Sequence, residues 1–291
     1  MDKRFRDWMA LDRATRDFQL SPSQSAKDAT GVLTAMVAET EAARADPALE
    51  SRCDIAYGDG PAARLDLYRP AKAEGPLPCL VFLHGGFWQE GDKSVSGYAA
   101  RALAKAGWAS VGVGYPLTPG VSLTELTQQV HEALRFIHDA ADRLGIDPER
   151  IVLAGHSAGG HLAASVVADI FGTGIAARIC GAVLISGVFE LAPIAASYVN
   201  DLARMTEGEI AALSPLRFAP ARQMPLHVLV GADEPEAFRM QSEVLAASWA
   251  GALPALESWQ APGRDHFDIL HELTDPASPT RRAMETMVAS G

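Results

Sequence analysis

The sequence has few cysteines and no long uninterrupted hydrophobic run. Among its 291 residues are three cysteines, Cys53, Cys79 and Cys180, which are too few and too far apart for a disulfide framework or a zinc knuckle. No segment approaches the roughly 20 apolar residues that span a bilayer. The first residues, MDKRFRDWMALDRATRDF, alternate charged and apolar side chains and lack the apolar core of a secretory signal. We therefore expect a cytoplasmic protein.

Basic residues are also scarce relative to acidic ones. The chain has 25 Lys and Arg against 36 Asp and Glu, a formal net charge of −11, and its basic residues are scattered. This distribution argues against binding to nucleic acid or to an anionic membrane. No G-x-G-x-x-G follows the first core strand, and there is no P-loop or H-E-x-x-H, so we expect no nucleotide or metal cofactor. The expected partner is a small-molecule substrate; a homodimer is compatible with the sequence.

From Cys79 onward, short apolar runs alternate with longer helical patterns. This alternation is typical of an α/β fold with a mainly parallel, twisted sheet and helices on both faces. We expect residues 1–291 to form a single domain. The runs CDIAYG and ARLDLYRP, which flank GDGPA, predict a hairpin at the sheet edge. The expected core strands are residues 79–84, 108–115, 150–156, 180–187 and 226–231.

One strongly periodic helix and two irregular regions complete the pattern. Apolar residues at intervals of three and four predict a helix over 123–144, with Ser122 and Glu125 as a capping box and Gly145 as its stop. Residues 1–45 look helical, and residues 188–223 insert a long mixed segment between two strands. Insertions of this length often form lids or binding loops, so we expect these two regions to form a small cap.

The stretch AGHSAGGH, residues 154–161, joins an apolar strand to a helix. A nucleophilic serine needs its hydroxyl at the top of a sheet, on a turn too tight for side chains at the flanking positions. The pattern G-x-S-x-G meets that requirement, with Ser157 between Gly155 and Gly159. An idle serine on a glycine-rich turn is the structural alternative. The strand before the motif and the helix after it favour the nucleophile.

A second motif, HGGFW at residues 84–88, follows the first core strand. Glycines there let backbone N–H groups approach a developing alkoxide, so Gly85 and Gly86 predict an oxyanion loop. The expected donors are the N–H groups of Gly86 and Phe87, joined by that of Ala158 at the start of the next helix.

The base and the acid should follow the serine in the order acid, then histidine. His266 follows the last strand-like run, whereas His271 falls within an expected helix, so we predict His266 as the base. The acid belongs just after residues 226–231, where Asp233 is the usual residue type and Glu234 has the usual offset from Gly231. These two criteria disagree. Both residues remain candidates, with a slight preference for Glu234.

These segments resemble the α/β-hydrolases of the kynurenine formamidase (arylformamidase) family, close to the hormone-sensitive-lipase-like esterases. The resemblance runs from about residue 53 to residue 272, and its most specific parts are HGGFW and GHSAGGH. Phe87 stands where the family more usually has Tyr. The other segments that carry it are HGGFWQEGDKS, GHSAGGHLAA, SGVFELAPI with VND and LSP, PEAFRMQSEVLAASW, and DHFDIL.

The resemblance implies a serine hydrolase that cleaves an aryl formamide such as N-formylkynurenine, in tryptophan catabolism, through an acyl-enzyme on Ser157. It also implies that the aryl group lies under the cap. A broad carboxylesterase acting on short acyl esters would use the same residues and is the main alternative, while a non-catalytic hydrolase-fold scaffold is a second one. The aromatic side chains that could stack on the aryl group are Phe87, Trp88, Phe189, Tyr198 and Phe267.

Overall fold

The computed structural model describes residues 1–289 and is built on one eight-stranded sheet, in the spatial order β1-β2-β4-β3-β5-β6-β7-β8. Strands β3 to β8 run parallel to one another, while β2 is antiparallel to both β1 and β4. The predicted α/β fold, its core strands and its edge hairpin are therefore confirmed. The strands are β1 (Leu49–Ala56), β2 (Arg64–Pro70), β3 (Leu77–Leu83), β4 (Ala109–Val113), β5 (Ile146–His156), β6 (Gly181–Ile185), β7 (Leu226–Gly231) and β8 (Leu256–Ala261).

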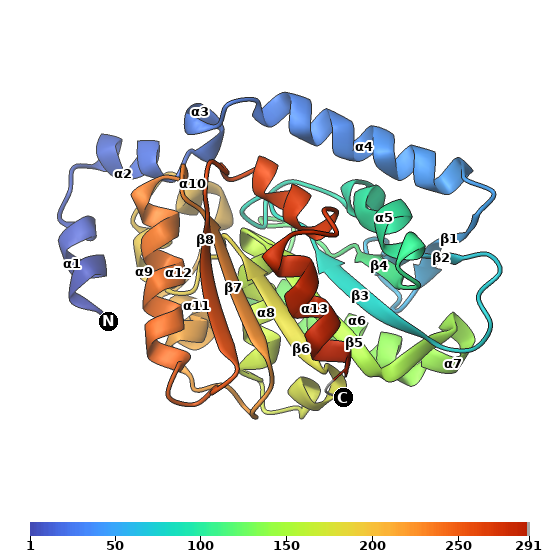
Figure 1. Ribbon diagram of the computed structural model, residues 1–291. Helices are drawn as coiled ribbons and strands as arrows, with labels where there is room; N and C mark the ends of the chain where they lie inside the picture. Colours follow the sequence, from blue (N-terminus) through green and yellow to red (C-terminus); the bar gives the residue numbers. More distant parts are fainter. Residues whose placement is uncertain (290–291) are drawn as a thin grey trace.

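Helices surround this sheet (Figure 1). The longer ones are α4 (Ala29–Ala45), α6 (Leu123–Asp139), α8 (Ala158–Val167), α12 (Glu236–Trp249) and α13 (Pro279–Ala289). The shorter ones are α1 (Lys3–Met9), α2 (Arg13–Gln19), α3 (Pro22–Ser25), α5 (Ala100–Lys105), α7 (Ala141–Leu144), α9 (Leu191–Ala195), α10 (Val199–Ala203) and α11 (Glu207–Leu213). Four 3-10 turns are η1 (Lys93–Ala99), η2 (Ile175–Arg178), η3 (Pro215–Arg217) and η4 (Asp268–Leu273). Within residues 1–289, no helix combines the length and the apolar character needed to cross a membrane.

The sheet is apolar on both faces because successive side chains of a strand point in opposite directions. In β3, Val81 and Leu83 join a buried cluster with α6, α8 and α12. Leu80 and Phe82 join a second cluster with α4, α5 and α13. The near-continuous apolar runs in the sequence follow from this double coverage.

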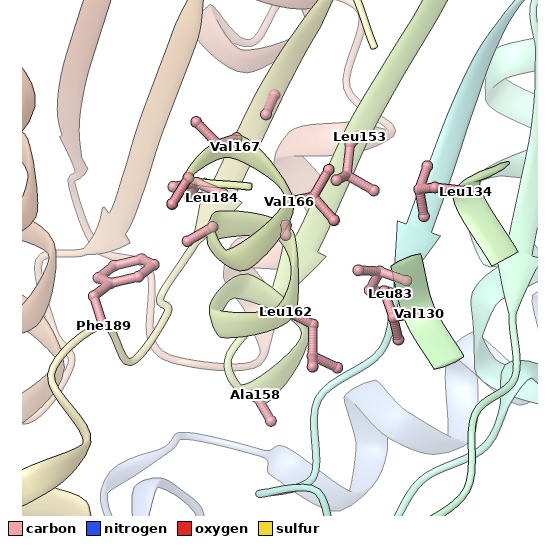
Figure 2. Close-up of a cluster of buried hydrophobic side chains, with 14 of the residues drawn as sticks. Leu83, Val130, Leu134, Leu153, Ala158, Leu162, Val166, Val167, Leu184 and Phe189 are labelled. Carbon is pink, nitrogen blue, oxygen red and sulfur yellow. The ribbon is translucent and has the colours of Figure 1, made fainter. Parts of the chain in front are cut away.

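Helix α8 carries the serine motif and is buried on every side. A helix that is apolar all round belongs inside a core. Figure 2 shows Leu162 and Val166 of α8 among side chains from three strands and from α6. The helix therefore fixes the start of its first turn, where the serine lies.

The predicted helix over residues 123–144 is divided into α6 and α7. Its capping box is present, since the Ser122 side chain accepts from the Glu125 N–H and Glu125 accepts from Ser122. The chain leaves the helical dihedrals at Ala140 (φ −98°, ψ 8°), and Gly145 ends α7 with φ 66°. The N-cap and the glycine stop are therefore confirmed.

The N-terminal segment runs along one end of the sheet, with α3 and α4 at the top of Figure 1. A fully buried carboxylate ties α4 and η1 to β2. Asp66 accepts from Arg44 of α4 at 2.8 Å and from Lys93 of η1 at 2.7 Å. Because two cations compensate the buried charge, this network fixes α4 relative to the sheet.

The insertion over 188–223 folds into α9, α10, α11 and η3. It is held by polar contacts with a buried amide, since Gln241 of α12 accepts the N–H groups of Phe189 at 2.8 Å and Glu190 at 2.9 Å. Glu190 is itself buried and pairs with Arg217 at 2.6 Å. The root of the insertion is therefore part of the packed body of the protein.

Candidate active site

Ser157 lies on the turn between β5 and α8. Its φ of 55° and ψ of −116° are strained for a residue with a side chain, and its N–H donates to the carbonyl of Ile185 at 2.8 Å. A Cβ on Gly155 would overlap the carbonyl oxygen of Gly159, and one on Gly159 would overlap that of Leu83. The two glycines are therefore required by close backbone approach, which holds Ser157 at the carboxyl edge of the sheet.

His266 and Glu234 form a hydrogen-bonded, buried pair. His266 Nδ1 donates to Glu234 Oε2 at 2.6 Å, and both residues are 3% exposed. The other carboxylate oxygen, Oε1, accepts from Ser186 Oγ at 2.5 Å and from the Gly231 N–H at 2.7 Å. With Oε1 occupied, Oε2 is the oxygen that faces the imidazole. Since a carboxylate only accepts, the proton of a neutral His266 lies on Nδ1 and leaves Nε2 as a base.

Asp233, the other candidate acid, points elsewhere. Its carboxylate is half-exposed and pairs with Lys27 Nζ at 2.9 Å. Lys27 also donates its backbone N–H to Asp265 at 2.9 Å and its ammonium to the Gly263 carbonyl at 2.7 Å. Asp233 therefore helps to fasten the N-terminal segment to the loop that carries His266, and the structure joins only Glu234 to the imidazole.

Two rings pack on the imidazole of His266. The ring centroid of Phe238 lies 4.3 Å away and that of His156 lies 4.6 Å away. His156 Nε2 donates to the backbone carbonyl of His266 at 2.8 Å. Burial holds the pKa of His156 well below its usual value, so this neighbour is neutral at pH 7. No positive charge on His156 therefore opposes protonation of His266.

The loop after β3 faces Ser157. A Cβ on Gly85 would lie 3.1 Å from the Ser157 Cβ, and Gly86 has a φ of 111°. The backbone N–H groups of Gly86, Phe87 and Ala158 have no acceptor within residues 1–289. Gly86 and Phe87 line a cavity, so their free N–H groups are available to a developing oxyanion.

A histidine and a tyrosine hold the start of this loop. His84 stacks on Tyr115 with ring centroids 4.2 Å apart, and the Tyr115 hydroxyl donates to the His84 carbonyl at 2.6 Å. Burial lowers the pKa of His84, so its ring is neutral at pH 7. These contacts fix the loop from beneath and agree with the structural role that its position suggests.

Ser157, His266, Gly85, Gly86 and Phe87 all line one cavity of about 520 Å³. Most of its outer wall comes from residues 22–37, in α3 and α4. The 188–223 insertion contributes only Tyr198 to the wall. The expected cap is therefore formed mainly by the N-terminal segment, because the rest of the insertion packs against the body of the protein.

The five aromatic candidates for the substrate pocket divide into two groups. Phe87, Tyr198 and Phe267 line the cavity, and the rings of Phe87 and Tyr198 lie edge to face at 6.5 Å. Trp88 and Phe189 are fully buried and do not line it, so the prediction for these two was wrong.

Trp88 and Phe189 are kept out of the cavity for different physical reasons. Trp88 has a φ of 62°, which turns its ring inward against His161 at 5.1 Å. Phe189 packs against Gly187, where a Cβ would overlap its ring, and Figure 2 shows it in the cluster around α8.

Sequence reasoning missed three residues of the site: Ser186, His156 and Phe238. Ser186 is buried, has a φ of 50° and orients Glu234. No local motif marks it, because its partner lies 48 residues away. His156 was identifiable from its place beside Ser157, although its bond to the His266 carbonyl was not. Phe238 looked like one more apolar residue of a helix.

A parallel sheet whose carboxyl edge presents a serine elbow, a carboxylate-bound histidine and free backbone donors is the arrangement of an α/β-hydrolase. Comparison with known proteins supports this class. The chain is 30% identical over 281 residues to the kynurenine formamidase of Danio rerio, with 92% of this chain and 94% of that protein covered. It is 31% identical over 283 residues to the kynurenine formamidase of Salmo salar, with the same coverage. The chain therefore belongs to the kynurenine formamidase family, and it is a hydrolase.

Two further matches support this assignment. The crystal structure of a proposed thioesterase from Silicibacter sp. TM1040 superposes with a TM-score of 0.81 at 30% identity, covering 92% of this chain and 98% of that one. The BD-FAE family profile matches residues 65–170, which include the oxyanion loop and the serine elbow.

Proposed function

We propose that this enzyme hydrolyses aryl formamides such as N-formylkynurenine, releasing formate and the free arylamine. The observation that carries the proposal is that His266, hydrogen-bonded to Glu234, lines one cavity with Ser157 and with Gly86 and Phe87, whose N–H groups are free. Membership of the kynurenine formamidase family supports the choice of substrate.

The first half of the reaction is transfer of the formyl group to the enzyme. Ser157 Oγ attacks the formyl carbon while His266 Nε2 takes the hydroxyl proton. The N–H groups of Gly86, Phe87 and Ala158 stabilise the resulting oxyanion. When the tetrahedral intermediate collapses, the carbon–nitrogen bond breaks and His266 returns the proton to the departing arylamine. Glu234 stabilises the imidazolium between these steps.

The second half is hydrolysis of the formyl ester on Ser157. A water molecule attacks the ester carbonyl as His266 accepts one of its protons, and the same backbone donors bind the second oxyanion. Collapse breaks the ester bond, His266 reprotonates Ser157 Oγ and formate leaves. The neutral His156 ring places no positive charge beside His266 in either half of the reaction.

The cavity wall suits an aryl leaving group. Phe87, Tyr198 and Phe267 offer ring faces and edges, and Leu33 and Val37 of α4 add apolar surface. A formyl group needs little room on the side of Ser157, where Gly85 approaches the serine closely. The apolar and aromatic part of the cavity wall is then available to the aryl leaving group.

A carboxylesterase acting on short acyl esters is the second candidate. The aliphatic walls formed by Leu33, Val37 and Leu270 would accept an alkyl group as readily as an aryl group. The nucleophile and the oxyanion donors are equally suited to an ester carbonyl.

Relative rates separate the two candidates. We expect kcat/KM for N-formylkynurenine to exceed that for p-nitrophenyl acetate, and both activities to vanish in Ser157→Ala. A formamide rate no higher than that for unrelated amides such as acetanilide, beside rapid ester hydrolysis, would favour the esterase.

We also propose the metabolic route and the cellular compartment in which this reaction takes place. Membership of the kynurenine formamidase family supports a role in tryptophan catabolism. A reducing compartment such as the cytoplasm is consistent with Cys53, Cys79 and Cys180, which are all free thiols.

A further inference from the structure

The cavity beside Ser157 contains one acidic side chain. Glu90 lines its wall at the end of the oxyanion loop, while the other lining residues within 1–289 are apolar, hydroxylic, glycine or histidine. The Glu90 N–H donates to the Gly86 carbonyl at 3.1 Å, and the Glu90 Cγ lies 3.0 Å from where a Cβ on Gly86 would be. The Glu90 side chain therefore starts from the end of the oxyanion loop, and the residue is exposed.

This carboxylate has no partner in the described part of the chain. Neither a hydrogen bond nor an ion pair involves its side chain, in contrast to two other acidic residues, Asp92 and Asp233. Asp92 caps η1 by accepting from the Ser94 N–H at 2.8 Å, and Asp233 pairs with Lys27. An exposed carboxylate without a partner is stabilised electrostatically by any cation that reaches it, particularly in a cavity with apolar walls.

Two lysines lie beside cavity-lining residues in the chain, and both are already paired. Lys27 is bound to Asp233 and to the Gly263 carbonyl, and Lys93 is bound to Asp54 at 2.8 Å and to Asp66 at 2.7 Å. The cavity itself has no lysine or arginine among its described lining residues. The net charge of −11 adds a general attraction for cations.

We propose that Glu90 is a specificity residue that binds a primary ammonium group on the leaving-group side of the substrate. This inference rests on the proposed function and narrows it to aryl formamides that carry an amine, such as the amino-acid side chain of N-formylkynurenine. Ser23, Thr30 and Thr34, from the N-terminal segment, also line the cavity, and their hydroxyl groups can donate to the carboxylate of such a zwitterion.

The test compares two substrates that differ only in the ammonium group: N-formylkynurenine and its desamino analogue. In the wild-type enzyme, kcat/KM should be about twofold to fivefold higher for N-formylkynurenine, as expected for a partly exposed charge pair. Glu90→Gln should remove that preference by lowering the N-formylkynurenine value, with the desamino value unchanged. Glu90→Lys should reverse the preference.

A matched control is Glu74→Gln, which changes the net charge equally at an exposed position outside the cavity. It should leave both values as in the wild type. If Glu90→Gln lowers the rates for both substrates equally, or changes neither, Glu90 does not bind the ammonium group and the inference is overturned.

A different result distinguishes failure of the formamidase proposal from failure of the inference about Glu90. If the wild type hydrolyses p-nitrophenyl acetate but neither formamide, the formamidase proposal fails. Inhibition of that ester reaction then decides the role of Glu90. Kynurenine should inhibit more strongly than desaminokynurenine in the wild type and equally in Glu90→Gln, whereas equal inhibition of the wild type would overturn the inference.

Discussion

Replacing Glu234 by glutamine probes the orientation of the base. The two oxygens of this carboxylate have different partners: Oε1 accepts from Ser186 and from the Gly231 N–H, while Oε2 accepts from His266 Nδ1. In Glu234→Gln, the amide oxygen must take the Oε1 position, because two donors point at it. The amide NH₂ then faces Nδ1, which must accept. His266 is thereby forced into the tautomer with its proton on Nε2, where it cannot act as the base.

The expected loss is large. Forcing the wrong tautomer on a catalytic histidine lowers kcat by about 1,000- to 10,000-fold, which corresponds to about 4–5.5 kcal/mol of transition-state stabilisation. The variant should still fold, because the amide preserves both donors to Oε1. Hydrolysis of N-formylkynurenine and of p-nitrophenyl acetate should fall together. Both reactions need His266 as the base for attack by Ser157, whichever leaving group follows.

Asp233→Asn is the matched control. It changes a neighbouring, half-exposed carboxylate whose contact is Lys27, so its kcat should stay within about twofold of the wild type and its stability within about 1 kcal/mol. A Glu234→Gln variant that keeps a tenth or more of the wild-type kcat would refute this reasoning, as would a severe loss in Asp233→Asn.

Three further perturbations test other parts of the account. Ser186→Ala removes a buried, charge-assisted hydrogen bond and should lower kcat by about tenfold to 100-fold with little change in KM; an unchanged kcat would show that Ser186 does not orient the acid. Gly159→Ala should prevent folding or activity because its Cβ overlaps a β3 carbonyl, whereas Gly251→Ala, with open space around it, should be tolerated in thermal melts and assays. Burial lowers the pKa of His131 and of His161 to about 4, so only the unfolded chain takes up these protons as the pH falls from about 6.5. Stability to urea is therefore retained above pH 6.5 and should decrease towards pH 5 by up to about 1.4 kcal/mol per pH unit for each histidine; a constant stability over this range would contradict the burial argument.

Much of the fold could be predicted because its signals are local. Apolar runs separated by helical periodicity define the strands, and Ser122, Glu125 and Gly145 mark the limits of the 123–144 helical segment. The elbow at Ser157 was recognisable because close backbone approach requires glycines at fixed offsets.

The remaining parts of the site depend on contacts between distant segments. The offset from Gly231 favoured Glu234, and the Gly231 N–H does bind its carboxylate, but no spacing rule connects Glu234 to Ser186, which also orients it. The wrong prediction for Trp88 arose because its backbone conformation, and not its residue type, turns the ring inward. The position of α4 over the cavity depends on the buried Asp66 network, which joins residues 22 and 27 positions apart in the chain.

The nucleophile is the central claim, and adduct mapping tests it most directly. A fluorophosphonate probe reacts with a serine only when a base and oxyanion donors activate it, and mass spectrometry of the digested protein then locates the adduct. We expect one adduct per chain, on the peptide that contains Ser157, none in Ser157→Ala, and much slower labelling in Glu234→Gln. An adduct on another residue, or undiminished labelling of Ser157→Ala, would contradict the account.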